Sequence, residues 1–127
     1  MPANPTAPAT DGGVERLGTI VHVPEGDSTY GKRAFRNVEN LLADETLASD
    51  VTVVCNGGGV DHLLRSASTA TRVRTLVERG VDVCACRNSL DSGGHDADEL
   101  VDGVRIVPTA MGELTKQQAS GSAYIRP

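Results

Sequence analysis

Short runs of β-branched residues alternate along this chain with segments whose apolar residues recur every three or four positions, and this alternation restricts the possible folds most strongly. A β-branched run predicts a buried strand, and the helical spacing predicts a helix that lies on a sheet. Strands that alternate with helices are typical of a parallel sheet covered on both faces. The sequence therefore predicts an α/β protein, a three-layer α/β/α sandwich around a mostly parallel sheet of about five strands.

The predicted elements follow one another without internal repeats. Strands are expected over residues 17–23, 50–55, 81–86, 104–107 and 123–126. Helices are expected over residues 31–47, around 70–77 and over 111–120, with a short helical turn at 96–100. Gly80 and Gly121 are expected to end two of these helices, because glycine readily adopts the left-handed backbone that follows a helix. Residues 88–95 are polar and contain glycine, which predicts a loop.

Residues 1–16 are expected to form a disordered N-terminal tail, and residues 17–127 a single domain. Residues 1–13 contain Pro, Ala, Thr and Gly without an apolar run, a composition unlike that of a secretory signal peptide. No stretch reaches the roughly 20 apolar residues that a membrane-spanning helix needs. With three cysteines, an odd count, these features predict a soluble cytoplasmic protein without a membrane partner.

The balance of charges argues against nucleic acid as a direct partner. The 12 basic and 17 acidic residues give a net charge of −5, which repels phosphate backbones and leaves no basic stripe. Ten of the basic residues are arginine and two are lysine. Together with the acidic excess, this composition is halophile-like, as in proteins from a salt-rich cytoplasm.

Cys86 is the residue best placed for chemistry, because it ends the predicted strand 81–86 and precedes Arg87 and Asn88. Ligands gather beyond the carboxyl ends of parallel strands, where backbone N–H groups converge. A cation and free N–H groups lower the pKa of a thiol and favour the reactive thiolate. The alternative interpretation is that Cys86 is a small, inert, buried apolar residue, as many cysteines are.

The other two cysteines are expected to be structural. Cys84 lies two residues before Cys86 on the same strand, hence deeper on the same face, and this pair is poorly placed for a disulfide. Cys55 ends the strand 50–55. If that strand neighbours the strand 81–86, its sulfur can approach Cys86 and act as a resolving thiol, although we favour a packing role.

A glycine-rich segment follows Cys55, and its backbone N–H groups can cradle a phosphate or another small anion. The segment matches neither the dinucleotide-binding fingerprint nor the Walker pattern, so a tight turn from strand to helix is the alternative. With Asn88 it forms the predicted ligand-binding set: Asn56, Gly57, Gly58, Gly59 and Asn88.

His22 ends the first predicted strand and is a candidate proton carrier near neutral pH. His62 and His95 are expected to be surface or loop residues. The Cys and His spacings contain no paired set of the kind that holds a tetrahedral metal, so we expect no metal site.

Several segments have a familiar order and spacing: 80–90 with Cys84 and Cys86, then 103–108, 112–114 and 121–127, preceded by 37–43 and 53–59. Together they resemble the DsrE/DsrF-like family of intracellular sulfur-metabolism proteins, over residues 17–127. The resemblance implies a DsrE-like (YchN-like) fold and a homo-oligomer, often a trimer or a hexamer. It also implies a cysteine after the third strand that carries sulfane sulfur as a persulfide, and Cys86 matches that position.

The chain departs from the family at Arg87, because many relatives have glycine directly after this cysteine. Arginine tolerates a positive φ poorly, so the loop can differ in conformation. Arg87 can equally supply a fixed cation for the thiolate.

The leading hypothesis is a cytoplasmic sulfur-relay protein, a possible sulfurtransferase or sulfur carrier that needs no cofactor. Cys86 would accept sulfur from a donor protein and pass it to an acceptor protein, while Arg87 stabilises the thiolate and His22 assists proton transfer. The alternatives are a non-enzymatic oligomeric scaffold that binds a small ligand at residues 56–59, and a thiol redox sensor that uses Cys86 and Cys55.

Overall fold

The computed structural model describes the backbone of residues 9–11 and 14–127. Its strands form one sheet in the order β1-β2-β3-β4-β5, with β6 also paired to β2. The strands are β1 (Ala9–Asp11), β2 (Val14–Val23), β3 (Leu47–Cys55), β4 (Asp82–Cys86), β5 (Arg105–Val107) and β6 (Ala123–Ile125). The five strands β2 to β6 are parallel to their neighbours, and β1 is antiparallel to β2.

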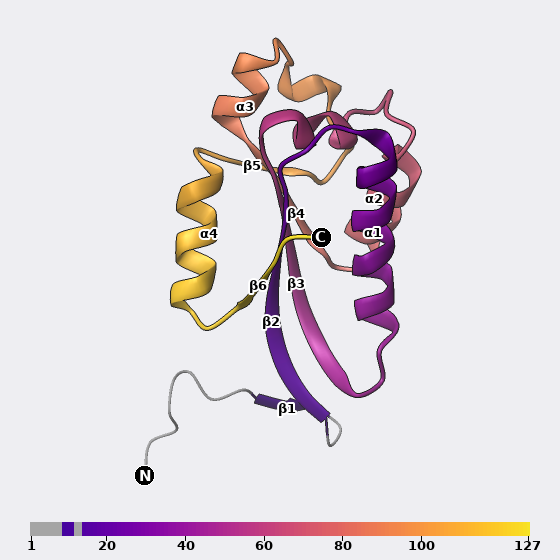
Figure 1. Ribbon diagram of the computed structural model, residues 1–127, viewed down its shortest axis with the longest axis vertical. Helices are drawn as coiled ribbons and strands as arrows, with labels where there is room; N and C mark the ends of the chain where they lie inside the picture. Colours follow the sequence, from indigo (N-terminus) through magenta and orange to yellow (C-terminus); the bar gives the residue numbers. More distant parts are fainter. Residues whose placement is uncertain (1–8, 12–13) are drawn as a thin grey trace.

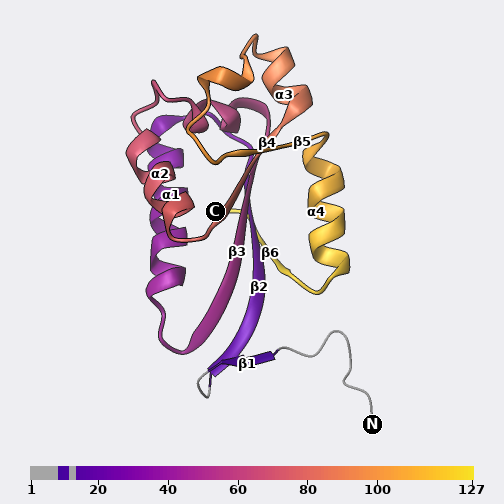
Figure 2. The same ribbon diagram turned by 180° about the vertical axis from the view of Figure 1, so that it is seen from behind.

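Helices lie on both faces of the sheet, which confirms the predicted three-layer α/β/α sandwich (Figures 1 and 2). The α-helices are α1 (Ser28–Ala43), α2 (Ala70–Glu78), α3 (Arg87–Ser92) and α4 (Ala110–Ala119), and the 3-10 helices are η1 (Gly57–Leu63) and η2 (Ala97–Glu99). Helices α1 and α2 cover one face and α4 covers the other, while α3 lies beyond the carboxyl ends of the strands. No helix in this described part of the chain is long and apolar enough to cross a membrane.

Helix α1 forms because its apolar side chains share one face and its first turn is capped. The carboxylate of Asp27 accepts a hydrogen bond from the backbone N–H of Tyr30 at 3.0 Å, which satisfies one of the free donors at the start of the helix. Ala34, Phe35 and Val38 then recur at helical spacing and are buried against the sheet. This face fixes the helix over β2 and β3.

The core is divided by the sheet into two clusters of buried residues. The larger cluster lies under α1 and α2 and contains Phe35, Val53 and Cys55. The smaller cluster lies under α4 and contains Cys84 and Cys86, together with Ile20, Val54, Val107, Ala110 and Leu114. Successive side chains of a strand point to opposite faces, so a residue's cluster follows from its position in the strand.

Two expectations about the first half of the chain need correction. Residues 9–11 and 14–16 belong to strands β1 and β2 rather than to a disordered tail, because β1 pairs with the start of the long strand β2. The remaining tail residues, 1–8 and 12–13, lie outside the described residues. The helix expected over 31–47 is α1 at Ser28–Ala43, since β3 already begins at Leu47.

The loop expected over residues 88–95 contains helix α3, which starts directly after Cys86. The other turn predictions are confirmed. Gly80, with a φ of 90°, follows α2, and Gly121, with a φ of 101°, follows α4.

Candidate functional site

Cys86 lies at the carboxyl end of β4, directly before the first residue of α3. Its side chain is only 5% exposed and packs in the cluster under α4, beside Val107 of β5 and Ala110 of α4. Because β5 ends at Val107 and α4 begins at Ala110, the start of α4 is brought to the sulfur. The sulfur therefore lies where two helices begin.

Burial by itself raises the pKa of the Cys86 thiol, because a thiolate is poorly solvated among apolar side chains. Four hydrogen-bond donors counteract burial and bring the pKa below its ordinary value: the Ser89 hydroxyl and the backbone N–H groups of Ser89, Ala110 and Asn88. A thiolate with several fixed donors is the state of cysteine that acts as a nucleophile. The environment at Cys86 therefore favours a reactive sulfur.

Arg87 is the first residue of α3, and its side chain is exposed. The groups that lower the pKa of Cys86 are amide hydrogens and a hydroxyl, all of them neutral. Arg87 adopts a helical backbone without a positive φ, so this chain needs no glycine after the cysteine. The role of Arg87 as a cation for the thiolate stays a prediction.

Cys84 is fully buried one pleat below Cys86, as expected for a packing residue. Burial, followed by the nearby carboxylate of Asp82, raises the pKa of the Cys84 thiol to about 12. Its S–H donates a weak hydrogen bond to Asp82 at 3.6 Å. Cys84 is therefore a protonated, unreactive thiol near neutral pH.

Cys55 lies on the other side of the sheet from Cys86. It pairs with Ala85 across β3 and β4, so the side chain of Cys86, one position further along, points to the opposite face. Cys55 accordingly belongs to the core under α1 and α2. Burial raises the pKa of its thiol far above the ordinary value. This arrangement contradicts a resolving role, because the Cβ vectors of a disulfide pair must point toward each other.

His22 is buried in β2 and forms hydrogen bonds through both ring nitrogens. Its Nδ1 lies 2.6 Å from the hydroxyl of Tyr124 in β6, and its Nε2 lies 2.9 Å from Oδ1 of Asn56. The imidazole and the phenol rings are also in contact, with centroids 5.7 Å apart. His22 therefore reaches Asn56, the residue that follows β3.

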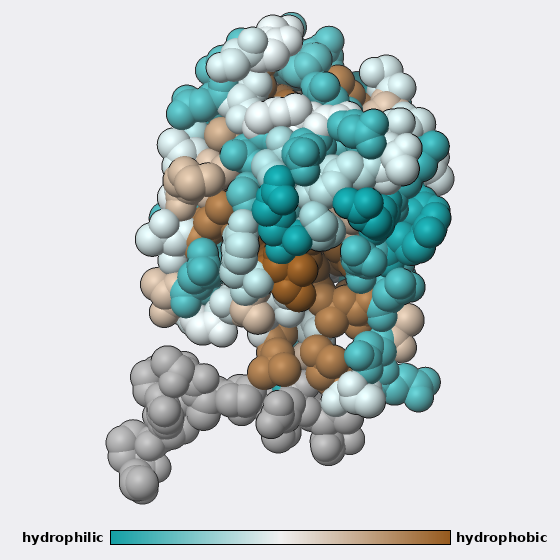
Figure 3. Space-filling model, viewed as in Figure 1, coloured by the Kyte–Doolittle hydropathy of each residue, from teal (hydrophilic) through white to brown (hydrophobic). Residues whose placement is uncertain are grey.

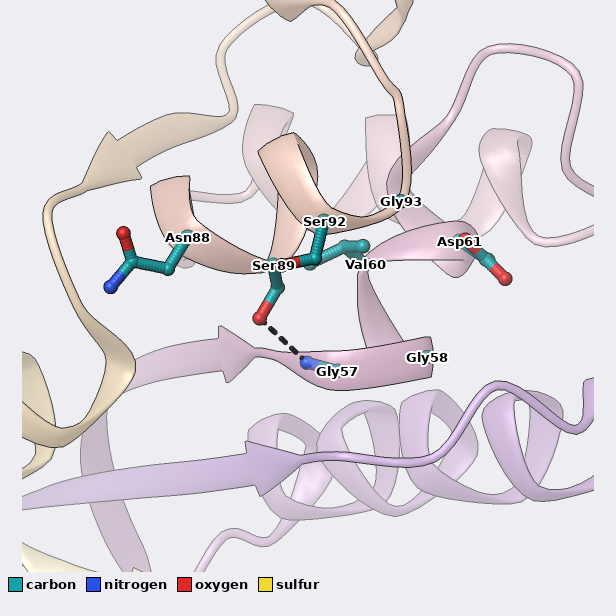
Figure 4. Close-up of a pocket in the computed structure, with 8 residues that line it drawn as sticks. All are labelled: Gly57, Gly58, Val60, Asp61, Asn88, Ser89, Ser92 and Gly93. Carbon is teal, nitrogen blue, oxygen red and sulfur yellow. Dashed lines mark hydrogen bonds between the residues drawn. The ribbon is translucent and has the colours of Figure 1, made fainter.

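The glycine-rich segment 56–59 divides into two parts. Gly57 and Gly58, together with Asn88 and Ser89, line a pocket of about 390 Å³ between η1 and α3, completed by Val60, Asp61, Ser92 and Gly93 (Figure 4). Ser89 points toward Gly57 and accepts a hydrogen bond from its backbone N–H at 2.8 Å.

Gly59 lies outside this pocket and has a packing role. A methyl group on Gly59 would collide with the carbonyl oxygen of Val23, the last residue of β2. The absence of a side chain thus lets η1 cross close to the end of β2. The structure brings Gly57, Gly58 and Asn88 together at the pocket and places Asn56 and Gly59 elsewhere.

His62 is buried, which corrects the expectation of a surface residue. Its ring fits against Gly31 of α1, where any side chain would collide with it, and its Nε2 lies 2.7 Å from the carbonyl oxygen of Glu25. His95 is partly exposed after α3 and lies 3.1 Å from a carboxylate oxygen of Asp61. Within residues 9–11 and 14–127, no group of three or more Cys, His, Asp or Glu side chains is arranged to hold a metal ion.

Sequence reasoning missed two residues at this site. The sequence predicts a loop after Cys86, and a loop gives no reason to place Ser89 at the sulfur. Because helix α3 begins directly after Cys86, the serine three residues later faces the cysteine. The contact of Tyr124 with His22 cannot be predicted from local sequence patterns, because the two residues are 102 positions apart. The parallel pairing of β6 with β2 brings the two residues together, and no local sequence pattern indicates that pairing.

Known proteins similar to this chain share its fold along nearly their whole length. A protein of unknown function from Methanobacterium thermoautotrophicum, MTH1491, is 35% identical, with a TM-score of 0.83 over 87% of this chain and 99% of that protein. The ychN protein from E. coli is 18% identical, with a TM-score of 0.74 over the same shares. No curated protein matches the chain. The model of the DsrE/DsrF-like family matches residues 16–127, and the chain therefore belongs to the DsrE/DsrF-like family.

Proposed function

We propose that this protein is a cytoplasmic sulfur relay in which Cys86 carries sulfane sulfur as a persulfide. The observation that carries the proposal is the set of four donors around the Cys86 sulfur, which lower the pKa of the thiol in spite of burial. Membership of a family associated with sulfur metabolism supports the same chemistry. The two other cysteines are buried thiols with raised pKa values, so the chemistry falls to Cys86 alone.

The transfer has two steps that need no external oxidant or reductant. The Cys86 thiolate attacks the outer sulfur of a donor persulfide, the S–S bond of the donor breaks, and the donor leaves as a thiolate with the electron pair. The outer sulfur and its proton now belong to a Cys86 persulfide. An acceptor thiolate then attacks that outer sulfur, and the Cys86 thiolate is the leaving group, which its donors stabilise.

The proposal is tested by loading the reduced protein with glutathione persulfide and measuring its mass. We expect a gain equal to one sulfur atom, located on Cys86 by peptide mapping. Cys86→Ser should take up no sulfur, while the matched control Cys84→Ala should take it up like the wild type. A wild-type protein that gains no sulfur, or a Cys86→Ser variant that gains as much, would refute the proposal.

We also propose that the chain forms a homo-oligomer, a trimer or a hexamer, through the β6 side of the sheet. Tyr124 and Ile125 of β6 are 43% and 46% exposed, although both are large apolar residues. Apolar residues gather near β6 and over the adjoining parts of β2 and β3 (Figure 3). Such an edge strand invites association. Light scattering should give the wild type a mass that is three or six times that of one chain, and Ile125→Arg a smaller mass. A monomeric wild type would refute the proposed oligomer.

The pocket beside α3 supports a second candidate function, the binding of a small ligand. Its lining offers the backbone of Gly58 and the side chains of Asn88 and Ser92 as polar groups, while the Gly57 N–H and the Ser89 hydroxyl are already hydrogen-bonded. A ligand that binds only the folded protein raises its melting temperature by an amount that grows with the logarithm of concentration over Kd. A thermal-shift screen of nucleotides and small anions tests this, with Asn88→Ala abolishing any genuine shift.

A further inference from the structure

The hydrogen-bonded chain from Tyr124 through His22 to Asn56 fixes the orientation of one side-chain amide. Nε2 of His22 lies 2.9 Å from Oδ1 of Asn56, and because an amide oxygen only accepts, Nε2 carries the hydrogen and donates this hydrogen bond. In that tautomer of the neutral imidazole Nδ1 is an acceptor, so the Tyr124 hydroxyl, 2.6 Å away, donates to it. The amide of Asn56 is thereby held with its oxygen toward β2 and its NH₂ group away from it.

Asn56 and Cys86 occupy neighbouring positions on adjacent strands. Cys55 and Ala85 form the last pair between β3 and β4, and Asn56 and Cys86 are the residues that directly follow them in the sequence. The backbone of Asn56 is extended, with φ −141° and ψ 173°, so its side chain alternates to the face opposite Cys55. That is the face on which Cys86 lies. β3 stands between β2 and β4, so an amide whose oxygen points to β2 presents its NH₂ group on the β4 side.

The NH₂ group of Asn56 has no hydrogen-bond acceptor among the residues that the structure describes. The same side chain does not cap the helix η1 that it precedes, so helix capping does not explain the asparagine. The Cys86 sulfur itself is already served by donors from α3 and α4. When the Cys86 persulfide loses its proton to water, however, the negative charge lies on the outer sulfur, one bond beyond the atom that these donors contact.

We propose that the Asn56 amide donates a hydrogen bond to the outer sulfur of the Cys86 persulfide, and that His22 and Tyr124 are positioning residues that orient this amide. The inference rests on the proposed persulfide function and names how the loaded state is stabilised. It replaces the proton-transfer role predicted for His22, whose two ring nitrogens are both engaged. A hydrogen bond to a charged sulfur is worth enough to change loading about tenfold or more.

The experiment measures the rate and yield of sulfur uptake from glutathione persulfide by mass spectrometry. Asn56→Ala removes the donor and should load about tenfold more slowly. Asn56→Asp keeps the acceptor for His22 but replaces the donor with an anion, and should load more slowly still. The matched control is Asn37→Asp, the same change at an exposed residue of α1 on the far side of the sheet, which should load like the wild type.

The positioning roles are separated from packing by conservative variants. His22→Gln places an amide N–H near the position of Nε2 and should recover most of the loading that His22→Asn loses. Tyr124→Phe removes one hydroxyl and keeps the ring, so it should fold normally and load less. In all variants, iodoacetamide alkylation of unloaded Cys86 should keep its pH profile, except in Asn56→Asp, where the added charge shifts it upward.

The outcomes separate the two proposals. If the wild type takes up sulfur and both Asn56→Ala and Asn56→Asp take it up as fast as the wild type, the role of Asn56 is refuted. The proposed sulfur relay then still stands. If His22→Gln and His22→Asn lose loading to the same extent, the orienting role of His22 is refuted. If the wild type takes up no sulfur, both proposals fail together.

Discussion

Replacement of Ser89 by alanine tests the physical basis of reactivity at Cys86. The Ser89 hydroxyl is the strongest of the donors that lower the pKa of the Cys86 thiol. A hydrogen bond to a charged group contributes about 1.5–3 kcal/mol, and about 1.4 kcal/mol corresponds to one pKa unit. Ser89→Ala should therefore raise the pKa of Cys86 by about one unit or more.

Because Ser89→Ala raises the pKa of the Cys86 thiol, the two proteins should differ in reactivity only over a defined pH range. Below the pKa of the wild-type thiol, the thiolate fraction and hence the alkylation rate should be about tenfold lower in Ser89→Ala. Above the pKa of the variant, the two rates should converge. Iodoacetamide alkylation mapped to Cys86 across pH measures this, because the buried Cys55 and Cys84 stay protonated.

Two further variants make the test specific. Ser89→Thr keeps the hydroxyl and should keep the low pKa. Ser92→Ala removes an exposed hydroxyl from the same helix and the same pocket, and should leave the profile unchanged. The backbone N–H of Gly57 loses its acceptor in Ser89→Ala but faces water, so the fold should lose less than about 1 kcal/mol. An unshifted profile in a folded Ser89→Ala protein would show that this donor does not govern the thiolate.

Three other predictions concern the fold and the remaining cysteines. The hydrogen bond from Gln117 holds the pKa of Glu113 below its ordinary value despite burial. The ionised carboxylate therefore stabilises the fold fully at pH values above the ordinary pKa of glutamate. This stabilisation is lost as the pH falls through the lowered pKa of the folded protein. Glu113→Gln should thus lower the free energy of unfolding by about 1–2 kcal/mol near neutral pH, with the gap closing in acid in urea titrations. Gly59→Ala should cost about 2 kcal/mol or more by the same measurement, because the methyl group meets the end of β2, and unchanged stability would contradict the close approach. Mild oxidation should give no disulfide between Cys55 and Cys86, and a mapped bridge between them would contradict the strand register.

The architecture could be predicted from the sequence because its elements depend on local patterns. The run 50–55 is apolar and β-branched, and the residues of α1 that contact the sheet recur at helical spacing. Each pattern has one favourable arrangement, with the apolar side chains against the sheet. Gly80 and Gly121 mark the helix ends for an equally local reason, their positive φ.

The site could be predicted only in part, because its contacts depend on strand register. Cys86 was identifiable from its place at a strand end, but the donor from Ala110 reaches it only because β5 pairs with β4. Helix α3 has one buried apolar residue, Leu90, so its sequence carries no helical stripe. His62 is buried because Gly31 leaves room and Glu25 offers a carbonyl oxygen, which no local pattern records.

The division of the three thiols by the sheet has a consequence for how long a loaded state survives. Cys55 lies on the opposite face of the sheet from Cys86. Cys84 is protonated and lies two residues earlier on the same strand, where it is poorly placed to form a disulfide with Cys86. Neither of the other two cysteines can reach an oxidised or sulfur-bearing Cys86, so in the proposed relay the lifetime of that state would be set by encounters with other molecules. In the proposed relay, Cys86 would therefore release its sulfur only when an acceptor molecule contacts it.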